Sequence, residues 1–409
     1  HISLCNSIIV IICLIDQFSP QSDCNMIILP TFYYALSVLH SSSAMSVVPE
    51  QNSQFKAPAS PNLKAEWITR PAKGNVGSTP QMPTPARSGH VAFKSGESVF
   101  IFGGYGEEIL QGGPAIRSPM NDLWRCSSND GSCESLDQKN PPEERLVSAI
   151  SVLNGKPYLF GGWNPNNRDG AENEILDTVH SLDLGSYEWT DLPTRIPDGP
   201  TSRHVTLVLP RKSRVLLHNH RCVDHIYIFD QEKESFTKQK TSGNAPSSRG
   251  LHVACMMGSF ALFFGGADKT QGMSNEAFLL DTITWEWTQV KFEETEDYPV
   301  ARAAPCLVSF NENCALLYGG AKVGDKGLDP LNDLWALAVN RYSGEGKWIS
   351  LASSIKEDQP AGRNAATLTE INAPADDDKK AKYFALHGGW APFRQTWNDA
   401  FILRVSSSQ

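Results

Sequence analysis

Short apolar runs recur along this chain from residue 62 to residue 406, and turn residues separate them. Five of the runs end in two glycines: VFIFGG, PYLFGG, ALFFGG, ALLYGG and FALHGG. Runs of this kind, rich in aliphatic and aromatic residues and bounded by Gly and Pro, predict β-strands. Because successive positions in a run are apolar, we expect both faces of each sheet to be buried.

Six arginines mark the same point of a repeated unit. Each ends a turn and precedes an apolar run, and in five of the six a Pro stands three positions earlier. The Gly-Gly pair follows 16 residues after the first, second and fourth Arg, and an insertion delays it in the sixth unit. The third unit has Asn219 and His220 where the glycines are expected. The six are Arg87, Arg145, Arg203, Arg249, Arg302 and Arg363.

The second half of each unit follows a loop of variable length. It begins with NDLW, NEAF, NDLW or NDAF in the first, fourth, fifth and sixth units. In three units an aromatic residue stands six positions after the Asp that ends the third run: Trp189, Phe236 and Trp287. Each unit thus contains four short strands, and the period of 46 to 61 residues fits one blade of a β-propeller.

Gly-Gly, then an aromatic residue, then Trp is the pattern of kelch repeats. Residues 62–406 resemble the kelch-repeat, galactose oxidase-like β-propeller family, and the resemblance implies an all-β, six-bladed propeller. The last unit leaves no room for a fourth strand, whereas LKAEWITRP, with Trp67, precedes the first Arg. We therefore expect an N-terminal strand to complete the last blade and remove an exposed sheet edge. The propeller domain is expected to span residues 60–409.

Residues 1–59 are expected to form a separate N-terminal segment. Its two apolar runs, 8–15 and 26–39, are each shorter than the roughly 20 residues that span a bilayer. Three interpretations stay open: sequence upstream of a start at Met45, a secretory signal from Met26 to Ala44, or a truncated membrane anchor. The chain contains no Asn-x-Ser/Thr acceptor, which favours a cytoplasmic protein, whereas a signal at Met26 would make it secreted.

Charge and cysteine content narrow the possible partners. The 409 residues carry a net charge of −9, and no basic block provides the clustered cations that nucleic-acid phosphates require. No basic amphipathic stretch indicates membrane binding. Six cysteines follow residue 59, of which Cys126 and Cys133 either form a bridge or stay reduced like the others. We expect a monomer that binds a protein, and neither nucleic acid nor a membrane.

The variable loops and the six arginines are expected to share one face of the propeller, because connections between strands two and three lie on the same side as connections between blades. Long loops on a rigid scaffold are common binding sites. The arginines could bind carboxylates or phosphates there. Alternatively, each pairs with an acid of the NDLW type, such as Asp122, Glu276, Asp333 or Asp399. The candidate binding residues are the six arginines with Tyr105, Trp163, Trp390, Phe393 and Trp397.

The third unit holds His218, His220, Cys222 and His225 within eight residues. Three of these side chains could point the same way along a strand, and imidazole and thiolate are ligands of zinc. The spacing matches no established zinc motif, and a shortened loop in a drifted repeat explains the same crowding. A metal site and a drifted blade are the two interpretations of this segment.

The sequence favours binding over catalysis. It contains no Gly-rich phosphate loop and no nucleophile elbow. We expect a non-catalytic module that needs no cofactor and binds a protein, such as an extended or acidic peptide, through its loop-rich face. The alternative is a metal-assisted enzyme, or a kelch protein of the specifier type, that acts on a small molecule in the central pocket. The Glu-x-x-x-Asp-x-x-x-His ligand run of specifier proteins does not occur here.

Overall fold

The computed structural model describes most of the chain after residue 57. The described ranges are 58–68, 82–109, 115–128, 131–165, 174–210, 213–293, 297–325, 327–352, 359–374, 381–392 and 394–407. They belong to one compact unit, Ala57–Gln409. The predicted N-terminal segment lies outside them up to residue 57. Within these ranges, no helix has the length and apolar character needed to cross a membrane.

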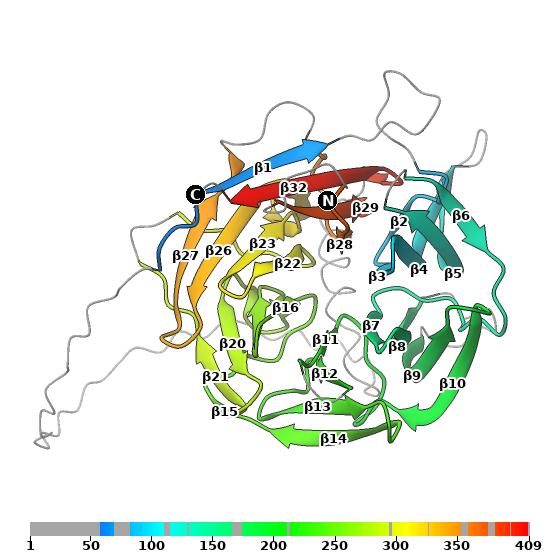
Figure 1. Cartoon of the computed structure of the whole chain (residues 1–409), viewed down its shortest axis with the longest axis horizontal. Coiled ribbons are helices and arrows are strands. Elements are labelled where there is room, and N and C mark those ends of the chain that lie inside the picture. Colours follow the sequence, from blue (N-terminus) through cyan, green and yellow to red (C-terminus); the bar gives the residue numbers. More distant parts are fainter. Residues whose placement is uncertain are drawn as a thin grey trace, which may run out of the picture. The chain divides into compact units, whose positions relative to one another are not determined.

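Six antiparallel sheets form a ring, which confirms the predicted six-bladed propeller (Figure 1). Each blade has four main strands, counted outward from the centre of the ring. In blades 1 to 3 these are β3 (Val91–Ser95), β4 (Ser98–Ile109), β5 (Ala115–Ser127) and β6 (Cys133–Leu136); β7 (Ala149–Leu153), β8 (Lys156–Asn164), β9 (Glu174–Asp183) and β10 (Glu188–Arg195); and β11 (Val205–Val208), β12 (Arg214–His218), β13 (His225–Asp230) and β14 (Ser235–Lys240).

Blades 4 and 5 repeat this order, and blade 6 is completed from the other end of the chain. The strands are β16 (Val253–Met257), β17 (Phe260–Phe264), β20 (Ala277–Asp281) and β21 (Glu286–Gln289); β22 (Cys306–Asn311), β23 (Cys314–Tyr318), β26 (Leu334–Asn340) and β27 (Glu345–Ser350); and β28 (Thr367–Ile371), β29 (Ala381–His387), β32 (Ala400–Ser407) and β1 (Leu63–Ile68). Strand β1 is antiparallel to β32, with Trp67 opposite Leu403. The predicted closure of the ring is therefore confirmed.

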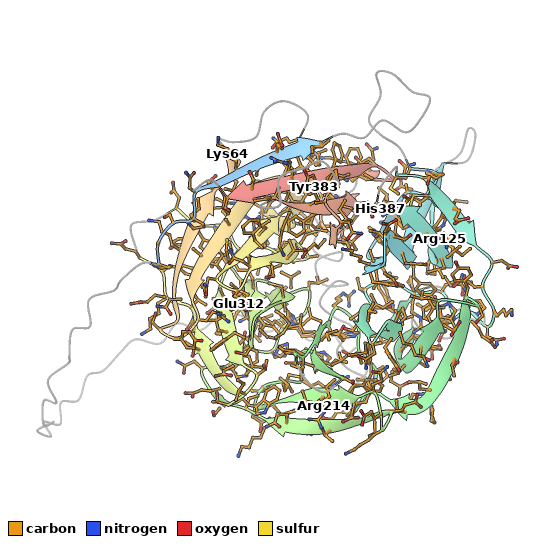
Figure 2. All side chains as sticks on the ribbon, in the orientation of Figure 1. Lys64, Arg125, Arg214, Glu312, Tyr383 and His387 are labelled. Atoms are coloured by element: carbon orange, nitrogen blue, oxygen red, sulfur yellow. A yellow bond between two sulfur atoms is a disulfide. The ribbon has the colours of Figure 1, made fainter. Side chains whose placement is uncertain are left out.

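Side chains from adjacent sheets fill the space between blades (Figure 2). Six clusters of buried apolar residues lie there, one at each interface between two blades. An aromatic residue on the outer strand packs against the residue that precedes the Gly-Gly position in the preceding blade. Trp189 lies 4.9 Å from Phe102, and Trp67 lies 5.0 Å from Tyr318, between ring centroids. Trp67 thus does for blade 6 what Trp189 does for blade 2.

The glycine pairs let one blade approach the turn that enters the next. A Cβ atom on Gly103 would lie 2.9 Å from the carbonyl oxygen of Arg145, which belongs to the turn before blade 2. A Cβ atom on Gly104 would lie 2.8 Å from the Cβ of His90. Both glycines have positive φ, 63° and 101°, which L side chains rarely adopt. The steric reason expected for Gly-Gly is therefore present.

A closed ring of six main-chain hydrogen bonds joins the blades around the centre. One residue in the turn before each inner strand donates its N–H to the carbonyl of the corresponding residue in the preceding blade, at N···O distances of 2.7 to 3.0 Å. All six residues have φ between 47° and 63°. These six residues stand where the chain enters the inner strands around the centre of the ring, and we call them the mouth residues: Gly89, Val147, Arg203, Leu251, Ala304 and Ala365.

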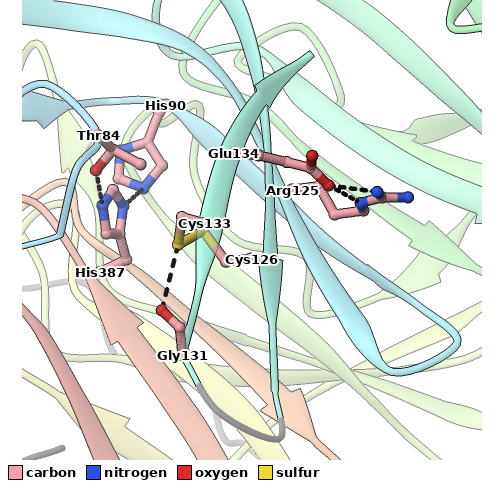
Figure 3. The surroundings of a disulfide bond; sticks show 8 residues. All are labelled: Thr84, His90, Arg125, Cys126, Gly131, Cys133, Glu134 and His387. Carbon is pink, nitrogen blue, oxygen red and sulfur yellow. Dashed lines mark hydrogen bonds and ion pairs between the residues drawn. A yellow bond between two sulfur atoms is a disulfide. The ribbon is translucent and has the colours of Figure 1, made fainter. Parts of the chain in front are cut away.

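Blade 1 carries a disulfide on its outer strands. Cys126 on β5 and Cys133 on β6 are register partners and their sulfur atoms are bonded, so this pair is bridged (Figure 3). The other four cysteines in the described ranges, Cys222, Cys255, Cys306 and Cys314, are free and buried.

Candidate functional site

One face of the propeller carries all the connections between strands two and three, together with the turns between blades. On this loop-rich face β4 and β5 run past their glycine pair, as do β8 and β9. Blades 4, 5 and 6 add short hairpins here: β18 (Ala267–Asp268) with β19 (Gly272–Met273), β24 (Ala321–Gly324) with β25 (Gly327–Pro330), and β30 (Trp390–Ala391) with β31 (Gln395–Thr396). In the described ranges, the opposite face carries the turns that join strands one and two of each blade and strands three and four of blades 1 to 5.

Five of the six arginines form an identical buried bracket. In each, Nε donates to the carbonyl two residues earlier in the chain, at 3.0 to 3.3 Å. Nη1 donates to the carbonyl of the first glycine of the same blade, at 2.8 to 3.2 Å. These bonds tie the entry turn to the end of the second strand. The five are Arg87, Arg145, Arg249, Arg302 and Arg363.

Four of these arginines also pair with the acid of the NDLW-type segment. Arg302 reaches Asp333 through two bonds of 2.7 and 2.8 Å, and its own side chain is fully buried. The Trp of the same segment, Trp335, donates to Asp333 as well, at 2.7 Å. Arg87–Asp122, Arg249–Glu276 and Arg363–Asp399 are equivalent pairs. The pairing interpretation is correct for these four.

Blades 2 and 3 depart from this pattern. Thr178 stands in place of the acid and accepts from Arg145 Nη1 at 3.0 Å, while Glu143 lies 3.7 Å from Arg145 Nη2. Arg203 is not equivalent to the other arginines, which corrects its alignment with them. It is a mouth residue, so Thr201 occupies the bracket position of blade 3.

The predicted aromatic residues lie against cations. The guanidinium of Arg117, on β5, is held between two of them, 4.5 Å from the Tyr105 ring and 4.9 Å from the Trp390 ring. Trp163 lies 5.1 Å from Arg203 and Trp397 lies 4.9 Å from Arg363, both to the guanidinium carbon. Phe393 lies outside the described residues. Arg117 was missed in the sequence because it stands outside the repeated motif, on the part of β5 that runs past the glycine pair and pairs with Glu107.

The structure does not assemble the predicted metal site of blade 3. His218 shares a hydrogen bond of 3.0 Å with His252, and Cys222 Sγ donates to Asn219 Oδ1 at 3.5 Å. His225 lies 2.8 Å from Asp224, and burial lowers the pKa of His220 to about 4. In the described ranges no group of three or more His, Cys, Asp or Glu side chains is placed to hold a metal ion. Neither Asn219 nor His220 keeps the positive φ of the glycines, so blade 3 departs from the other blades at this position.

Two pairs of buried histidines join neighbouring blades. His218 of blade 3 bonds His252 of blade 4, and His387 of blade 6 bonds His90 of blade 1 at 3.2 Å. Figure 3 shows the second pair with Thr84, whose hydroxyl lies 2.9 Å from His387 Nε2. Burial, followed by the charges of nearby arginines, lowers the pKa of both His218 and His387 to about 3.

Stability is expected to fall as the pH drops below 6.5. The histidines are neutral when folded and titrate near 6.5 when unfolded, so between pH 6.5 and about 3 the unfolded chain binds more protons. His204, His218 and His387, each with a pKa near 3, would together cost about 6 kcal/mol between pH 7 and pH 5. Urea unfolding at both pH values measures this loss, and His218→Gln should reduce the slope by about one proton. A flat profile would contradict it.

The centre of the ring contains a cavity of about 240 Å³ lined by the inner strands. Its lining is apolar or hydroxyl-bearing, apart from His204 and Cys306. Burial lowers the pKa of His204 to about 3 and raises that of the Cys306 thiol to about 12. Both groups are therefore uncharged at neutral pH, so the lining offers no acid–base pair.

Most of the strongly exposed apolar side chains in the described ranges lie on the loop-rich face, three of them on adjoining segments at blade 5. Five of the eight large apolar residues that are most exposed in the described ranges lie there, on four different connections: Ile116, Val223, Tyr298, Val300 and Val323. Val300 belongs to the turn before blade 5 and Val323 to the β24–β25 hairpin. The two segments are joined by backbone hydrogen bonds between Ala303 and Ala321. The other three, Val208, Ile283 and Tyr342, lie on the opposite face.

Comparison with known proteins gives matches among kelch proteins. Residues 215–409 match the model of the KLHDC2/KLHL20/DRC7 Kelch-repeats domain. Kelch domain-containing protein 2 of Bos taurus is 24% identical over 319 residues, which cover 70% of this chain and 74% of that protein. Host cell factor 2 of Homo sapiens is 23% identical over 315 residues. The match covers 68% of this chain but only 38% of host cell factor 2.

The fold also matches a solved structure. The structure of YjhT superposes with a TM-score of 0.56 at 14% identity, and the match covers 79% of this chain and 96% of the other. At this identity the likeness concerns the fold alone. It agrees with the ring of blades described above.

Proposed function

Because the chain belongs to the kelch-repeat β-propeller family, we propose that it is a non-catalytic module that binds another protein through its loop-rich face. The observation that carries this proposal is the set of exposed apolar side chains on that face. Exposed apolar residues grouped on loops of a rigid scaffold are typical of protein-binding surfaces. Tyr298, Val300 and Val323 belong to adjoining segments of blade 5 and its entry turn, and so mark the centre of the proposed surface.

The aromatic residues and Arg117 extend this surface towards blades 6 and 1. Trp390, Tyr105 and Arg117 stack on one another across the boundary between these blades. Stacked aromatic and Arg side chains lose little conformational freedom on binding, and such residues are common anchors at interfaces. The partner would be a protein segment laid across several loops, and the module would act as a monomer.

Catalysis in the central pocket has less support. The cavity lining offers neither a charged group nor an acid–base pair, and the arginines nearest to it are mostly committed to the brackets described above. A small apolar ligand could occupy 240 Å³ without chemistry taking place. No observation favours a metal-assisted or specifier-type reaction over binding.

Charged substitutions on the loop-rich face are expected to abolish partner recovery. We would immobilise the wild-type chain and the Val300→Asp/Val323→Asp variant and identify bound proteins by mass spectrometry. Val300 and Val323 are 48% and 61% exposed, so the folded state should tolerate the change, while an apolar contact with the partner would not.

The control is Ile283→Asp/Tyr342→Asp, which places the same charges on exposed residues of the opposite face. We expect wild-type recovery from this control and at least tenfold less from the first variant. Equal recovery from the two variants, with unchanged melting temperatures, would contradict the proposed face.

A further inference from the structure

Strand β6 of blade 1 carries no aromatic residue, although the outer strand of every other blade does. The place of that residue follows from the register, starting at the second residue before the Gly-Gly position. In blade 5 this residue, Leu317, lies opposite Trp335, and two positions further along the same strand Leu337 lies opposite the outer Trp348. The same count leads in blades 2, 3, 4 and 6 to Trp189, Phe236, Trp287 and Trp67.

In blade 1 the same count ends at the disulfide. Ile101 lies opposite Trp124, and two positions further along β5 Cys126 lies opposite Cys133. The sulfur atoms of these two residues are bonded, as Figure 3 shows. In blades 2, 4, 5 and 6 the two corresponding positions hold Leu on the third strand and Trp on the fourth. The disulfide therefore stands where a Leu–Trp pair joins the outer strands of four other blades.

The disulfide lies at the interface that closes the ring. Cys126 is buried in the apolar cluster between blades 1 and 6, together with Tyr383 and Ile402 of blade 6, and Cys133 packs against this cluster. Ile68 of β1 packs against it as well. Because blade 6 is built from both ends of the chain, a weaker contact at this interface would loosen the closure of the ring.

Little apolar burial fastens the outer strand of blade 1. Strand β6 has four residues, and none of them is buried. An ion pair with β5, between Arg125 and Glu134, is exposed, and such pairs contribute little to stability. The disulfide replaces the apolar contact of the other blades with a covalent bond. The attachment of β6 therefore depends on the oxidation state of two sulfur atoms.

Cys133 is the accessible half of this bond. It is partly exposed, and its sulfur lies 3.7 Å from the carbonyl oxygen of Gly131, an exposed residue of the turn between β5 and β6. The four free cysteines of the described ranges are buried, and burial raises the pKa of their thiols, to about 12 for Cys222, Cys306 and Cys314. These thiols are poor nucleophiles at neutral pH, whereas a reductant from solution can reach Cys133.

We propose that the Cys126–Cys133 disulfide is a thiol–disulfide exchange site that controls how firmly the ring is closed, with a dithiol as the reductant. A thiolate of the dithiol attacks the Cys133 sulfur, the S–S bond of the protein breaks, and Cys126 leaves as a thiolate that takes up a proton. The second thiolate of the dithiol then attacks the sulfur of its own molecule in the mixed disulfide, and Cys133 leaves and is protonated in turn. Two electrons have passed to the protein, and the dithiol has become a disulfide.

Reduction is expected to weaken the interface between blades 1 and 6. The two thiols fill less space than the Leu–Trp pair of other blades, and they no longer tie β6 to β5. Blade 1 then holds blade 6 less firmly. This effect concerns the scaffold and does not depend on the proposed binding of a protein.

Thiol labelling tests the exchange reaction. The folded, full-length chain is incubated with dithiothreitol, freed from the reductant, treated with N-ethylmaleimide and mapped by mass spectrometry. We expect label on Cys133, and none on the buried thiols of Cys222, Cys255, Cys306 and Cys314. If Cys133 is labelled only after unfolding in urea, the bond is a fixed structural link and the proposal is overturned.

Hydrogen–deuterium exchange tests the effect on the ring. We expect reduction to speed the exchange of backbone amides in β6 and in the strands of blade 6 by at least about tenfold, because opening is no longer limited by the covalent bond. Strands β20 and β21 of blade 4, on the other side of the ring, should exchange at the same rate in both states (Figure 1). Unchanged exchange in blade 6 after reduction would contradict the proposal.

Two double variants separate the bond from the space that it fills. Cys126→Ser/Cys133→Ser cannot form the bond and should exchange like the reduced wild type, with or without dithiothreitol. Cys126→Leu/Cys133→Trp restores the pair of blades 2, 4, 5 and 6 and should exchange slowly in both conditions.

The disulfide does not control closure if the Ser variant exchanges as slowly as the oxidised wild type, or if the Leu/Trp variant still responds to dithiothreitol. The comparison of oxidised and reduced wild type stands by itself if the Leu/Trp variant does not fold. Neither measurement uses a partner, so failure here leaves the proposed binding face unaffected.

Discussion

Removal of residues 58–68 is expected to lower the free energy of unfolding by about 5 kcal/mol or more, which is the sum of typical costs for losing a buried Leu and a packed Trp. Leu63 and Ala65 are buried against blade 5, and Trp67 contacts Tyr318 and Phe401. The deletion would also leave β32 as an open edge prone to association. Thermal and urea unfolding of the truncated chain measure the loss.

Alternation along β1 provides a control for this deletion. Lys64 and Glu66 point to solvent from the same strand, and Glu66 forms an exposed ion pair of 3.1 Å with Arg404. Replacing both by Ala should cost less than about 1 kcal/mol, because exposed ion pairs contribute little. Trp67→Ala alone should cost about 3 kcal/mol. A truncated chain as stable as the wild type would show that blade 6 closes without β1.

Asp399→Asn is expected to cost about 3–5 kcal/mol, because it leaves the charge of Arg363 buried and unpaired. Neither side chain of this pair reaches solvent to any extent. Arg363 would keep its bonds to Gly388 and Ala361 and its contact with the Trp397 ring, but it would lose its carboxylate partner. Chemical denaturation at pH 7 measures the change.

Two further variants test the cause of that loss. Arg363→Met/Asp399→Leu removes both charges and should regain most of the stability, since replacing a buried pair by apolar residues is often neutral. Glu134→Gln breaks the ion pair between Glu134 and Arg125, in which both side chains are about half exposed. This change should lower the free energy of unfolding by less than about 1 kcal/mol. If the double variant is as unstable as Asp399→Asn, the loss is one of packing and not of charge.

The repeated part of this molecule could be read from the sequence. Gly-Gly, the NDLW-type segment and the outer aromatic residue recur because each meets the same steric or electrostatic need in the blades that carry it. Thus Gly103 avoids the turn before blade 2, Asp333 meets Arg302, and Trp67 was identified as the missing outer residue of blade 6. Six blades and their closure follow from these needs.

The role of Arg203 could not be predicted in this way, because blade 3 differs from blade 1 in two features whose effects on residue spacing cancel: the length of a turn and the position of the Arg. Val91 pairs with Phe102 in blade 1, 11 positions apart, whereas Val205 pairs with His218 in blade 3, 13 positions apart. The turn between β11 and β12 is thus two residues longer, and Arg203 stands two positions later than a bracket arginine. The spacing of 16 residues to Asn219 is therefore preserved while the role of the Arg changes.

The paired histidines and the stacked Arg117 were also outside the reach of sequence. His218 and His252 are 34 positions apart, and His90 and His387 are 297 apart, so only the packing of blades brings them together. Arg117 lies on the part of β5 that runs past the glycine pair, outside the repeated motif. Contacts of this kind depend on the three-dimensional arrangement and leave no periodic signal.

The main-chain ring has a consequence for how this scaffold can change over evolution. The hydrogen bonds of the ring join peptide groups, so they do not require a particular side chain at any of the six positions. Gly, Ala, Val, Leu and Arg are all found among the six mouth residues of this molecule. Substitution of one mouth residue can therefore change the chemistry at one blade while the main-chain hydrogen bonds of the ring are kept.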